Sequence, residues 1–205
     1  MSPITSGWSA HLRHHCVIPL LDLVFPAACI GCGRVGTLLC PACAATITPV
    51  PPLRPTAADG LAPLLELRAL GLFADTLREA IHALKFSSLS SLAQPLSRLM
   101  ADKVREAAWP PSRIVPVPLH ANRQRQRGFN QAGLLAAGLA DALGWPFDDT
   151  LLCRQQQTRS QVGLTRSERQ RNVRDAFAVT GTASVQAEAI LLVDDVYTTG
   201  ATMLE

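Results

Sequence analysis

The sequence of 205 residues contains little lysine: of its 19 basic residues, 17 are arginine and only Lys85 and Lys103 are lysine. Charged residues make up 17% of the chain and hydrophobic residues 48%, a balance that excludes a chain disordered throughout. The 13 glycines and 15 prolines follow no period, which excludes collagen-like and coiled-coil architectures. The net charge of +3 is too small for a protein that coats nucleic acid. The cations are therefore mostly planar guanidinium groups, which suit two-point binding of phosphates and carboxylates.

The chain also lacks a long apolar run. The best candidate, residues 17–30, is interrupted by Pro19, Asp22 and Pro26. It falls short of the roughly 20 residues that a membrane-spanning helix needs, and the same interruptions argue against a secretion signal. We therefore expect a cytoplasmic protein without a membrane span, in which clustered cysteines hold a metal rather than form disulfides.

The length suits one domain with a small appendage. Apolar patterns predict strands at 65–71, 114–117 and 189–193, and helices at 12–24, 75–86, 89–107 and 131–143. Strands separated by helices favour an α/β fold with a mostly parallel sheet. Composition divides the chain into an N-terminal segment (1–28), a cysteine module (29–47), a proline-rich linker (48–60) and a main domain (61–205).

Four of the six cysteines form two C-x-x-C pairs separated by seven residues: Cys29, Cys32, Cys40 and Cys43. Four thiolates with this spacing suit tetrahedral zinc, and a site closed by four protein ligands is structural. Four unrelated thiols or a redox C-x-x-C are the alternatives. The sequence therefore predicts a structural Zn²⁺ in a module too small to fold on its own core.

The stretch LLVDDVYTTGATM is the most informative part of the chain. A buried strand delivers Asp194 and Asp195 to its carboxyl end, where α/β sheets bind ligands. The residues that follow are small and mostly hydroxylated: Thr198, Thr199, Gly200, Ala201 and Thr202. Two carboxylates suit the hydroxyls of a ribose, and a glycine-containing loop lets backbone N–H groups approach a phosphate. We expect a ligand that carries both groups.

This stretch resembles the phosphoribosyl-pyrophosphate (PRPP) motif of type I phosphoribosyltransferases. The chain as a whole resembles the ComF/GntX family over about residues 20–205. Besides the PRPP motif, the resemblance rests on the cysteine pairs and on two further segments, VPVPLHANRQRQRGFNQA and TRSQVGLTRSERQRNVRDAF. The resemblance implies an α/β fold with a type I phosphoribosyltransferase-like parallel sheet flanked by helices, behind a zinc module. It also implies Mg²⁺ bound with PRPP, a nitrogenous acceptor, and a link to DNA uptake or competence. Family members continue beyond Glu205, so we expect this domain to be truncated at its C-terminus.

Two arginine-rich segments complete the candidate site. Residues 120–174 contain nine arginines and only four acidic residues. Arg123 and Arg127 follow the strand at 114–117, where a PRPP site would face the pyrophosphate. The second segment resembles the mobile catalytic loop of the transferases. That resemblance implies catalytic roles for Gln161, Arg166 and Arg169, together with the two aspartates.

Two other interpretations of the arginines remain open. They can be solvated charges on a helix face, or they can bind nucleic-acid phosphates. Phe129 is the only aromatic residue in the first basic segment and the second has none, whereas a stacking surface for single strands needs more.

The sequence thus supports two functions. The first is PRPP-dependent transfer of phosphoribose, with residues 61–110 selecting the acceptor. The second is a non-catalytic DNA-uptake factor that docks a DNA-translocating protein or single-stranded DNA through its zinc module and arginines.

Overall fold

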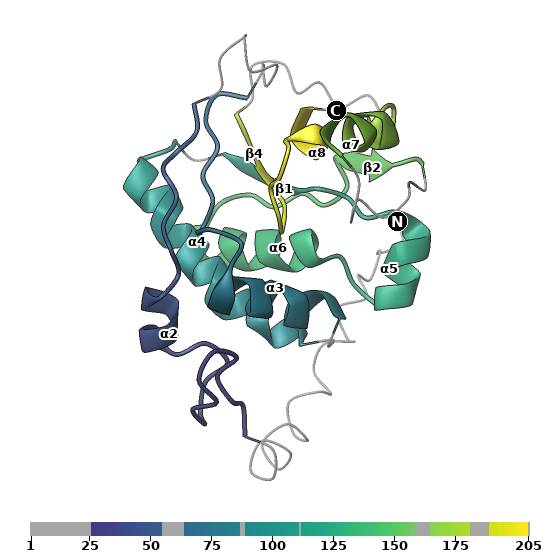
Figure 1. Ribbon diagram of the computed structural model, residues 1–205. Helices are drawn as coiled ribbons and strands as arrows, with labels where there is room; N and C mark the ends of the chain where they lie inside the picture. The colour runs from purple at the N-terminus through teal and green to yellow at the C-terminus, as the bar shows by residue number, and fades with distance from the viewer. Residues whose placement is uncertain are drawn as a thin grey trace, which may run out of the picture.

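A computed structural model describes residues 26–54, 64–86, 89–110, 112–156, 158, 165–180 and 189–204. The expected helix at 12–24 and part of the expected linker lie outside these residues. The helices, in chain order, are α2 (Pro41–Ala45), α3 (Asp75–Phe86), the short 3₁₀ helix η2 (Ser90–Leu92), α4 (Ala93–Ala107), α5 (Ala121–Arg127), α6 (Gln131–Leu143), α7 (Arg166–Val173) and α8 (Ala201–Leu204) (Figure 1). The strands are β1 (Arg113–Pro116), β2 (Leu152–Arg154), β3 (Phe177–Val179) and β4 (Ile190–Val193).

The centre of the fold is a parallel pair of strands, β1 and β4, in register from Arg113 opposite Ile190 to Pro116 opposite Val193. Ile114, Val115 and Val193 are buried. The expected parallel sheet is thereby confirmed, with two strands among the described residues. Both strands run in the same direction, so their carboxyl ends bring Pro116 and Val193 to one edge.

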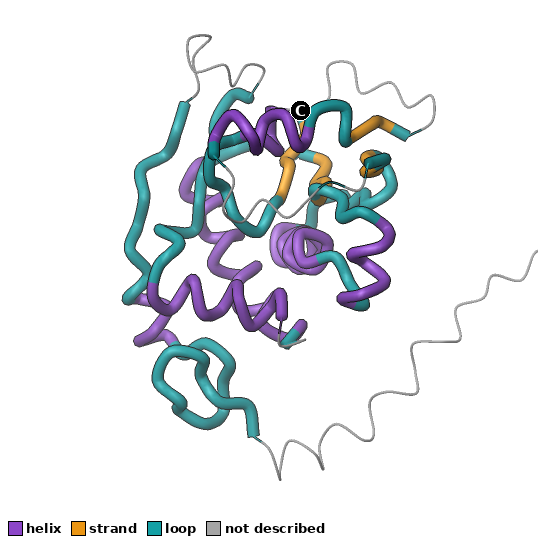
Figure 2. The backbone as a smooth tube through the Cα atoms, turned by 45° about the vertical axis from the view of Figure 1, so that its right-hand side comes forward, coloured by secondary structure: helices purple, strands orange, loops and turns teal. Residues whose placement is uncertain are grey.

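Two helices pack on this pair of strands, one behind the other. α6 packs on β1 and β4, and α4 packs on α6. The contact between α4 and α6 is close, because the buried Ser97 hydroxyl donates to the Leu135 carbonyl at 2.9 Å. Figure 2 shows the strands in the upper half of the molecule, with the long helices beside and below them.

Three helices match their predicted ranges closely. α3 buries Leu77, Ile81 and Leu84 on one face, as the spacing of its apolar residues predicted. α6 ends at Leu143, followed by Gly144 in a left-handed conformation with φ of 69°. Sequence reasoning placed α4 correctly but missed α5, α7 and the antiparallel pair β2–β3.

The expected strand at 65–71 is wrong as a regular strand. Leu67 forms a single antiparallel bridge with Leu53, with N–H···O distances of 2.9 and 2.8 Å. The partner segment contains Pro51 and Pro52, which have no N–H to extend the ladder. A further hydrogen bond, from the Leu72 amide to the Thr48 carbonyl at 2.8 Å, holds the two segments together.

Within the described ranges, every helix is too short or too polar to cross a lipid bilayer.

Candidate functional sites

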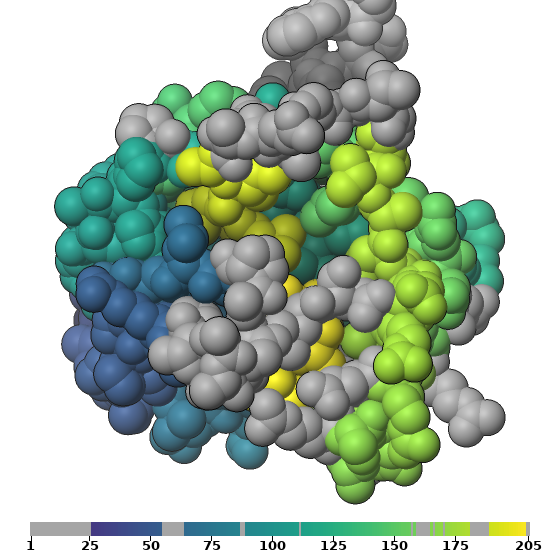
Figure 3. All heavy atoms as spheres, turned by 90° about the horizontal axis from the view of Figure 1, so that it is seen from above, coloured from purple at the N-terminus to yellow at the C-terminus, as the bar shows by residue number. Residues whose placement is uncertain are grey.

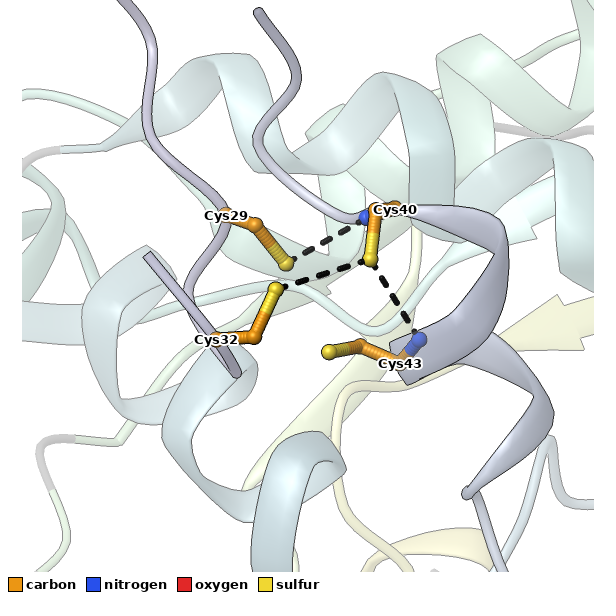
Figure 4. Close-up of side chains that lie close together, drawn as sticks. All are labelled: Cys29, Cys32, Cys40 and Cys43. Atoms are coloured by element: carbon orange, nitrogen blue, oxygen red, sulfur yellow. Dashed lines mark hydrogen bonds between the residues drawn. The ribbon is translucent and has the colours of Figure 1, made fainter. Parts of the chain in front are cut away.

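The four paired cysteines form a candidate metal centre. Their sulfurs all lie within 4.8 Å of one another, and the side chains converge on one point (Figure 4). The sulfurs of Cys32 and Cys40 are 3.7 Å apart. In a tetrahedron with Zn–S bonds of about 2.3 Å, the sulfurs lie roughly 3.8 Å apart, so the cluster has the dimensions of a structural zinc site.

Two glycines explain why the first cysteine pair can turn so tightly. Gly33 has a φ of 72°, which disfavours any residue with a Cβ. Gly31 has a different role, because a Cβ there would lie 2.8 Å from the sulfur of Cys43. The second pair lies at the start of α2, where the Cys40 sulfur accepts a hydrogen bond from the Cys43 amide at 3.4 Å.

Cys29 and Cys43 differ in how easily their thiols lose a proton. The Cys40 amide donates to the Cys29 sulfur at 3.3 Å, and such backbone hydrogen bonds lower the pKa of Cys29 to about 6. Hydrogen bonding to the sulfurs of Cys32 and Cys40 raises the pKa of Cys43 to about 12. Four thiolates would repel one another here unless a positive charge lay between them. A Zn²⁺ ion bound by the four sulfurs would supply that charge.

This cysteine cluster is attached to the main core. Leu39 belongs to the same buried cluster as Leu77 and Leu84 of α3. The hydroxyls of Thr46 and Thr76 lie 3.3 Å apart, joining the end of α2 to the first turn of α3. The cysteine cluster is therefore packed against the hydrophobic core.

The second candidate site lies where β4 ends. Asp194 and Asp195 follow the buried Val193, and the Asp195 amide donates to the Asp194 carboxylate at 2.8 Å. Lys85, near the end of α3, forms an ion pair with Asp195 at 2.8 Å. The Lys85 and Asp195 side chains are only 19% and 15% exposed, so this pair is largely shielded from water.

The environment of Asp194 changes the pKa of its carboxyl group. Burial and the charge of Asp195 raise the pKa of Asp194 from 3.8 to about 7, against the opposing effects of the Asp195 amide, Lys85 and Arg154. Asp194 can therefore donate or accept a proton near neutral pH, while Asp195 is held by Lys85.

The loop after the aspartates contacts the second arginine-rich segment. Arg169 of α7 donates to the Thr198 hydroxyl at 2.8 Å, and α7 packs on α8 through Val173 and Ala201. Gly200 has a φ of 77°, and the buried Thr199 hydroxyl has no hydrogen-bond partner. Seen from above in Figure 3, the yellow residues of β4 and α8 lie between blue residues from the first half of the chain and the green residues of α7 and β3.

Two further arginines meet beside this loop. Arg154 of β2 and Arg123 of α5 both donate to Thr158, Arg154 to the hydroxyl at 2.5 Å and Arg123 to the carbonyl at 2.9 Å. Burial and the charge of Arg123 lower the pKa of Arg154, whereas Asp194 acts in the opposite direction. The buried Nε of Arg154 has no partner. A pair of like charges held together in this way favours an anion between or beside them.

The remaining predicted residues lie elsewhere. Arg127 contacts the ring of Phe86 and donates to Gln131 at 3.0 Å. Arg166 begins α7, but its side chain lies outside the described part of the structure, as does the whole of Gln161. Thr202 is half-buried in α8.

Sequence reasoning missed Lys85 as a site residue. It lies more than 100 positions before the aspartates, in a helix that was assigned to acceptor selection. A signal was present, because Lys85 is one of only two lysines in a chain rich in arginine.

The fold and the two sites define a mixed α/β protein with a cysteine metal module and an acidic loop at the end of a parallel strand. The chain is 35% identical over 186 residues to the DNA utilization protein YhgH of Escherichia coli O6:H1, covering 87% of this chain and 80% of that protein. The chain belongs to the ComF family, as the sequence resemblance indicated.

Two other relatives match over shorter stretches. The DNA utilization protein YhgH of Salmonella typhi is 40% identical over 130 residues, which cover 61% of this chain and 56% of that protein. Competence protein F of Haemophilus influenzae is 34% identical over 142 residues, covering 66% of this chain and 62% of the relative. No family model matches the chain, and no solved structure matches it.

Proposed function

We propose that this protein binds PRPP with Mg²⁺ at the carboxyl end of β4 and transfers its phosphoribosyl group to a nitrogenous acceptor. The observation that carries the proposal is the gathering of positive groups from three separate elements around Asp194, Asp195 and the loop that follows them. Lys85 comes from α3 and Arg154 from β2, while Arg169 reaches the same loop from α7. A ligand with a diol and several phosphates uses both kinds of group.

The aspartates would hold the ribose hydroxyls. Asp195 keeps acceptor capacity after pairing with Lys85, because a carboxylate offers about four lone-pair sites. The Thr199 hydroxyl, now without a partner, would donate to the 5′-phosphate together with the backbone of the Gly200 turn. Arg154 and Arg123 would face the pyrophosphate and stabilise its charge as it leaves.

The reaction would break the bond between the anomeric carbon and the pyrophosphate oxygen and form one to the acceptor nitrogen. Mg²⁺ bound with PRPP would supply charge neutralisation on the leaving pyrophosphate. Asp194, with a pKa of about 7, is suited to take the proton that the acceptor nitrogen releases. Arg169 of α7 would close the loop over the bound ligand.

Calorimetric titration with PRPP and Mg²⁺ tests this function. Saturable heat is expected from the wild type and is expected to disappear in Asp194→Asn with Asp195→Asn. The matched control is Asp141→Asn, which changes an exposed carboxyl on α6 and should leave the titration unchanged. No binding to the folded wild type would sink the proposal.

We also propose a role in the use of external DNA, supported by the names of relatives as DNA utilization and competence proteins. This link supports a second candidate function, in which the chain is a non-catalytic factor that docks a DNA-translocating protein or single-stranded DNA. Release of pyrophosphate in an acceptor screen, lost in the double aspartate variant, would favour the transferase. PRPP binding without any such turnover would favour the second function.

A further inference from the structure

The ion pair between Lys85 and Asp195 joins two segments that the core holds in place. Lys85 lies in the last turn of α3, directly after the fully buried Leu84. Asp195 lies two positions after the buried Val193, and Val193 belongs to the same hydrophobic cluster as Leu84. The Val117 amide donates to the Val193 carbonyl at 2.8 Å, which fixes the end of β4. The backbone is therefore anchored on both sides of the ion pair.

The ion pair restricts the Asp195 carboxylate. Its closest contact is between the Lys85 ammonium and Oδ1 of Asp195, and both side chains are largely shielded from water. A carboxylate has about four lone-pair sites, so one that is held through a single oxygen can still accept hydrogen bonds from a ligand. A charge-assisted contact of this kind also limits the rotation of the side chain. Lys85 therefore fixes the direction in which the remaining acceptor sites of Asp195 face.

The Lys85 charge acts on both neighbouring carboxyl groups. Asp195 raises the pKa of Asp194, whereas Lys85 lowers it. A cation at this point therefore reduces the repulsion between two adjacent acidic groups that share a partly buried site.

A direct contact between Lys85 and a phosphate is the alternative, since lysine is a common phosphate ligand. Its ammonium is already engaged by Asp195. Arg154 suits a phosphate better, because its buried Nε has no hydrogen-bond partner. The contacts therefore favour a role for Lys85 that is exerted through Asp195.

We propose that Lys85 is a positioning residue: it holds the Asp195 carboxylate toward the ribose hydroxyls and thereby determines the preference of this site for ribose over 2-deoxyribose. The inference rests on the proposed function, because it concerns the same ligand site. A sugar without the hydroxyl leaves a partly buried acceptor unpaired, and this penalty is the source of the selectivity. The penalty arises only if the carboxylate is held facing the hydroxyls.

Titration with two sugar phosphates of equal charge tests the proposal on the full chain. Methyl ribofuranoside 5-phosphate and its 2-deoxy analogue have rings that cannot open, and they differ only in the 2-hydroxyl. A change in the charge of the site alters both affinities alike, so their ratio isolates the hydroxyl. The wild type should bind the ribose ligand at least about tenfold more tightly, as expected for one hydrogen bond to a charged group. In Lys85→Met this preference should fall to about threefold or less.

Further variants separate positioning from a merely structural role. Lys85→Arg keeps a cation and should retain most of the preference, whereas Lys85→Gln keeps the polar end without the charge and should lose it, as Lys85→Met does. Asp195→Asn should reduce the preference, and adding Lys85→Met to it should cause no further loss, because Lys85 acts through that carboxylate. Lys103→Met removes the other lysine, which pairs with Glu106 on α4, and should behave like the wild type.

Two results would overturn the proposal while the proposed function stands. One is an unchanged preference in folded Lys85→Met or Lys85→Gln, and the other is a wild type that binds PRPP but does not distinguish the two sugars. A further loss in the double variant would assign Lys85 a direct contact with the ligand and would also overturn the positioning role. A folded wild type that binds neither PRPP nor the sugar phosphates would overturn the proposed function together with this inference.

Discussion

Asp194 lies in an environment that changes the usual chemistry of its carboxyl group. Burial and the adjacent Asp195 raise its pKa to about 7, so in the folded chain it holds a proton that it would lose in water. Asp195 instead forms an ion pair with Lys85. The two neighbouring carboxyls therefore have different chemistry, although the sequence shows only a pair of identical side chains.

This difference predicts a pH dependence of stability. Between about pH 4 and 7 the folded chain binds a proton at Asp194 that the unfolded chain releases, so the free energy of unfolding falls as pH rises through this range. Asp194→Asn is neutral at every pH and removes this fall. At pH 8 it should be more stable than the wild type, on the order of 1–3 kcal/mol. Urea denaturation at several pH values measures this.

Two variants check the assignment to Asp194. Asp141→Asn changes an exposed carboxyl and should keep the wild-type fall with pH. Lys85→Met removes a charge that lowers the pKa of Asp194, so the fall should extend to higher pH. An unchanged pH profile in Asp194→Asn would contradict the role of this carboxyl.

Gly31 gives a second prediction for a single residue. A methyl group there would lie 2.8 Å from the Cys43 sulfur, so Gly31→Ala must displace that sulfur or the loop. Zinc should be released to a chromophoric chelator faster and more completely than from the wild type. Gly133→Ala, whose Cβ meets only ordinary contacts from 3.4 Å, should release zinc like the wild type.

At the scale of elements, the contact between α4 and α6 depends on a small residue. A Cβ at Gly138 would meet the Ser97 hydroxyl at 2.7 Å and the Ser97 Cβ at 2.9 Å. Ser97 is itself held in place by its hydrogen bond to Leu135. The two helices can therefore approach only because position 138 has no side chain.

The same helix offers a matched pair of substitutions with opposite signs. Gly138→Ala should destabilise the protein by about 1–3 kcal/mol, because overpacking outweighs the gain in helix propensity. Gly133→Ala, where the new Cβ fits, should stabilise it by up to about 1 kcal/mol. Chemical denaturation of both variants gives the two values. Equal changes would show that the α4–α6 contact is more adaptable than the structure indicates.

The elements that sequence could predict are those with a clear period or an unambiguous end. α6 has apolar spacing followed by Gly144, and β4 is a short apolar run that ends in two aspartates. α5 and α7 were missed because their sequences are almost entirely polar. Their positions depend on caps instead, such as the reciprocal hydrogen bonds between Thr165 and Glu168 at the start of α7.

The two candidate sites also differ in how far the sequence predicts them. Cysteine spacing predicted the metal centre, because all four ligands lie within 15 consecutive residues. The partners of the aspartates could not be predicted, since Lys85 and Arg154 reach them only through tertiary structure. The contact of Phe86 with Arg127 was hidden for the same reason.

At the scale of the whole molecule, the metal centre and the main domain share one hydrophobic core. Leu39, one position before Cys40, is buried with the side chains of α3 and α4. The cysteine module therefore does not pack as an independent knuckle.

This shared core predicts how the protein responds to metal removal. Chelation should lower the melting temperature of the whole molecule in a single transition, because loss of the metal loosens Leu39 and the core around it. Differential scanning calorimetry with and without chelator measures this shift. Cys40→Ser should reproduce it, whereas Cys153→Ser, outside the cluster, should retain the metal. A separate early transition with an unchanged main one would show that the two parts unfold independently.

The ion pair at the end of α3 has a practical consequence for labelling chemistry. The chain has only two lysine amines, and Lys103 has a 37% exposed side chain, paired with Glu106. Lys85 is 19% exposed and held by Asp195. An amine-acylating reagent should therefore modify Lys103 before Lys85. A ligand bound at the end of β4 should change the modification of Lys85 but not that of Lys103. The ratio of the two modified peptides in a mass spectrum then reports how much of the protein has ligand bound at this site.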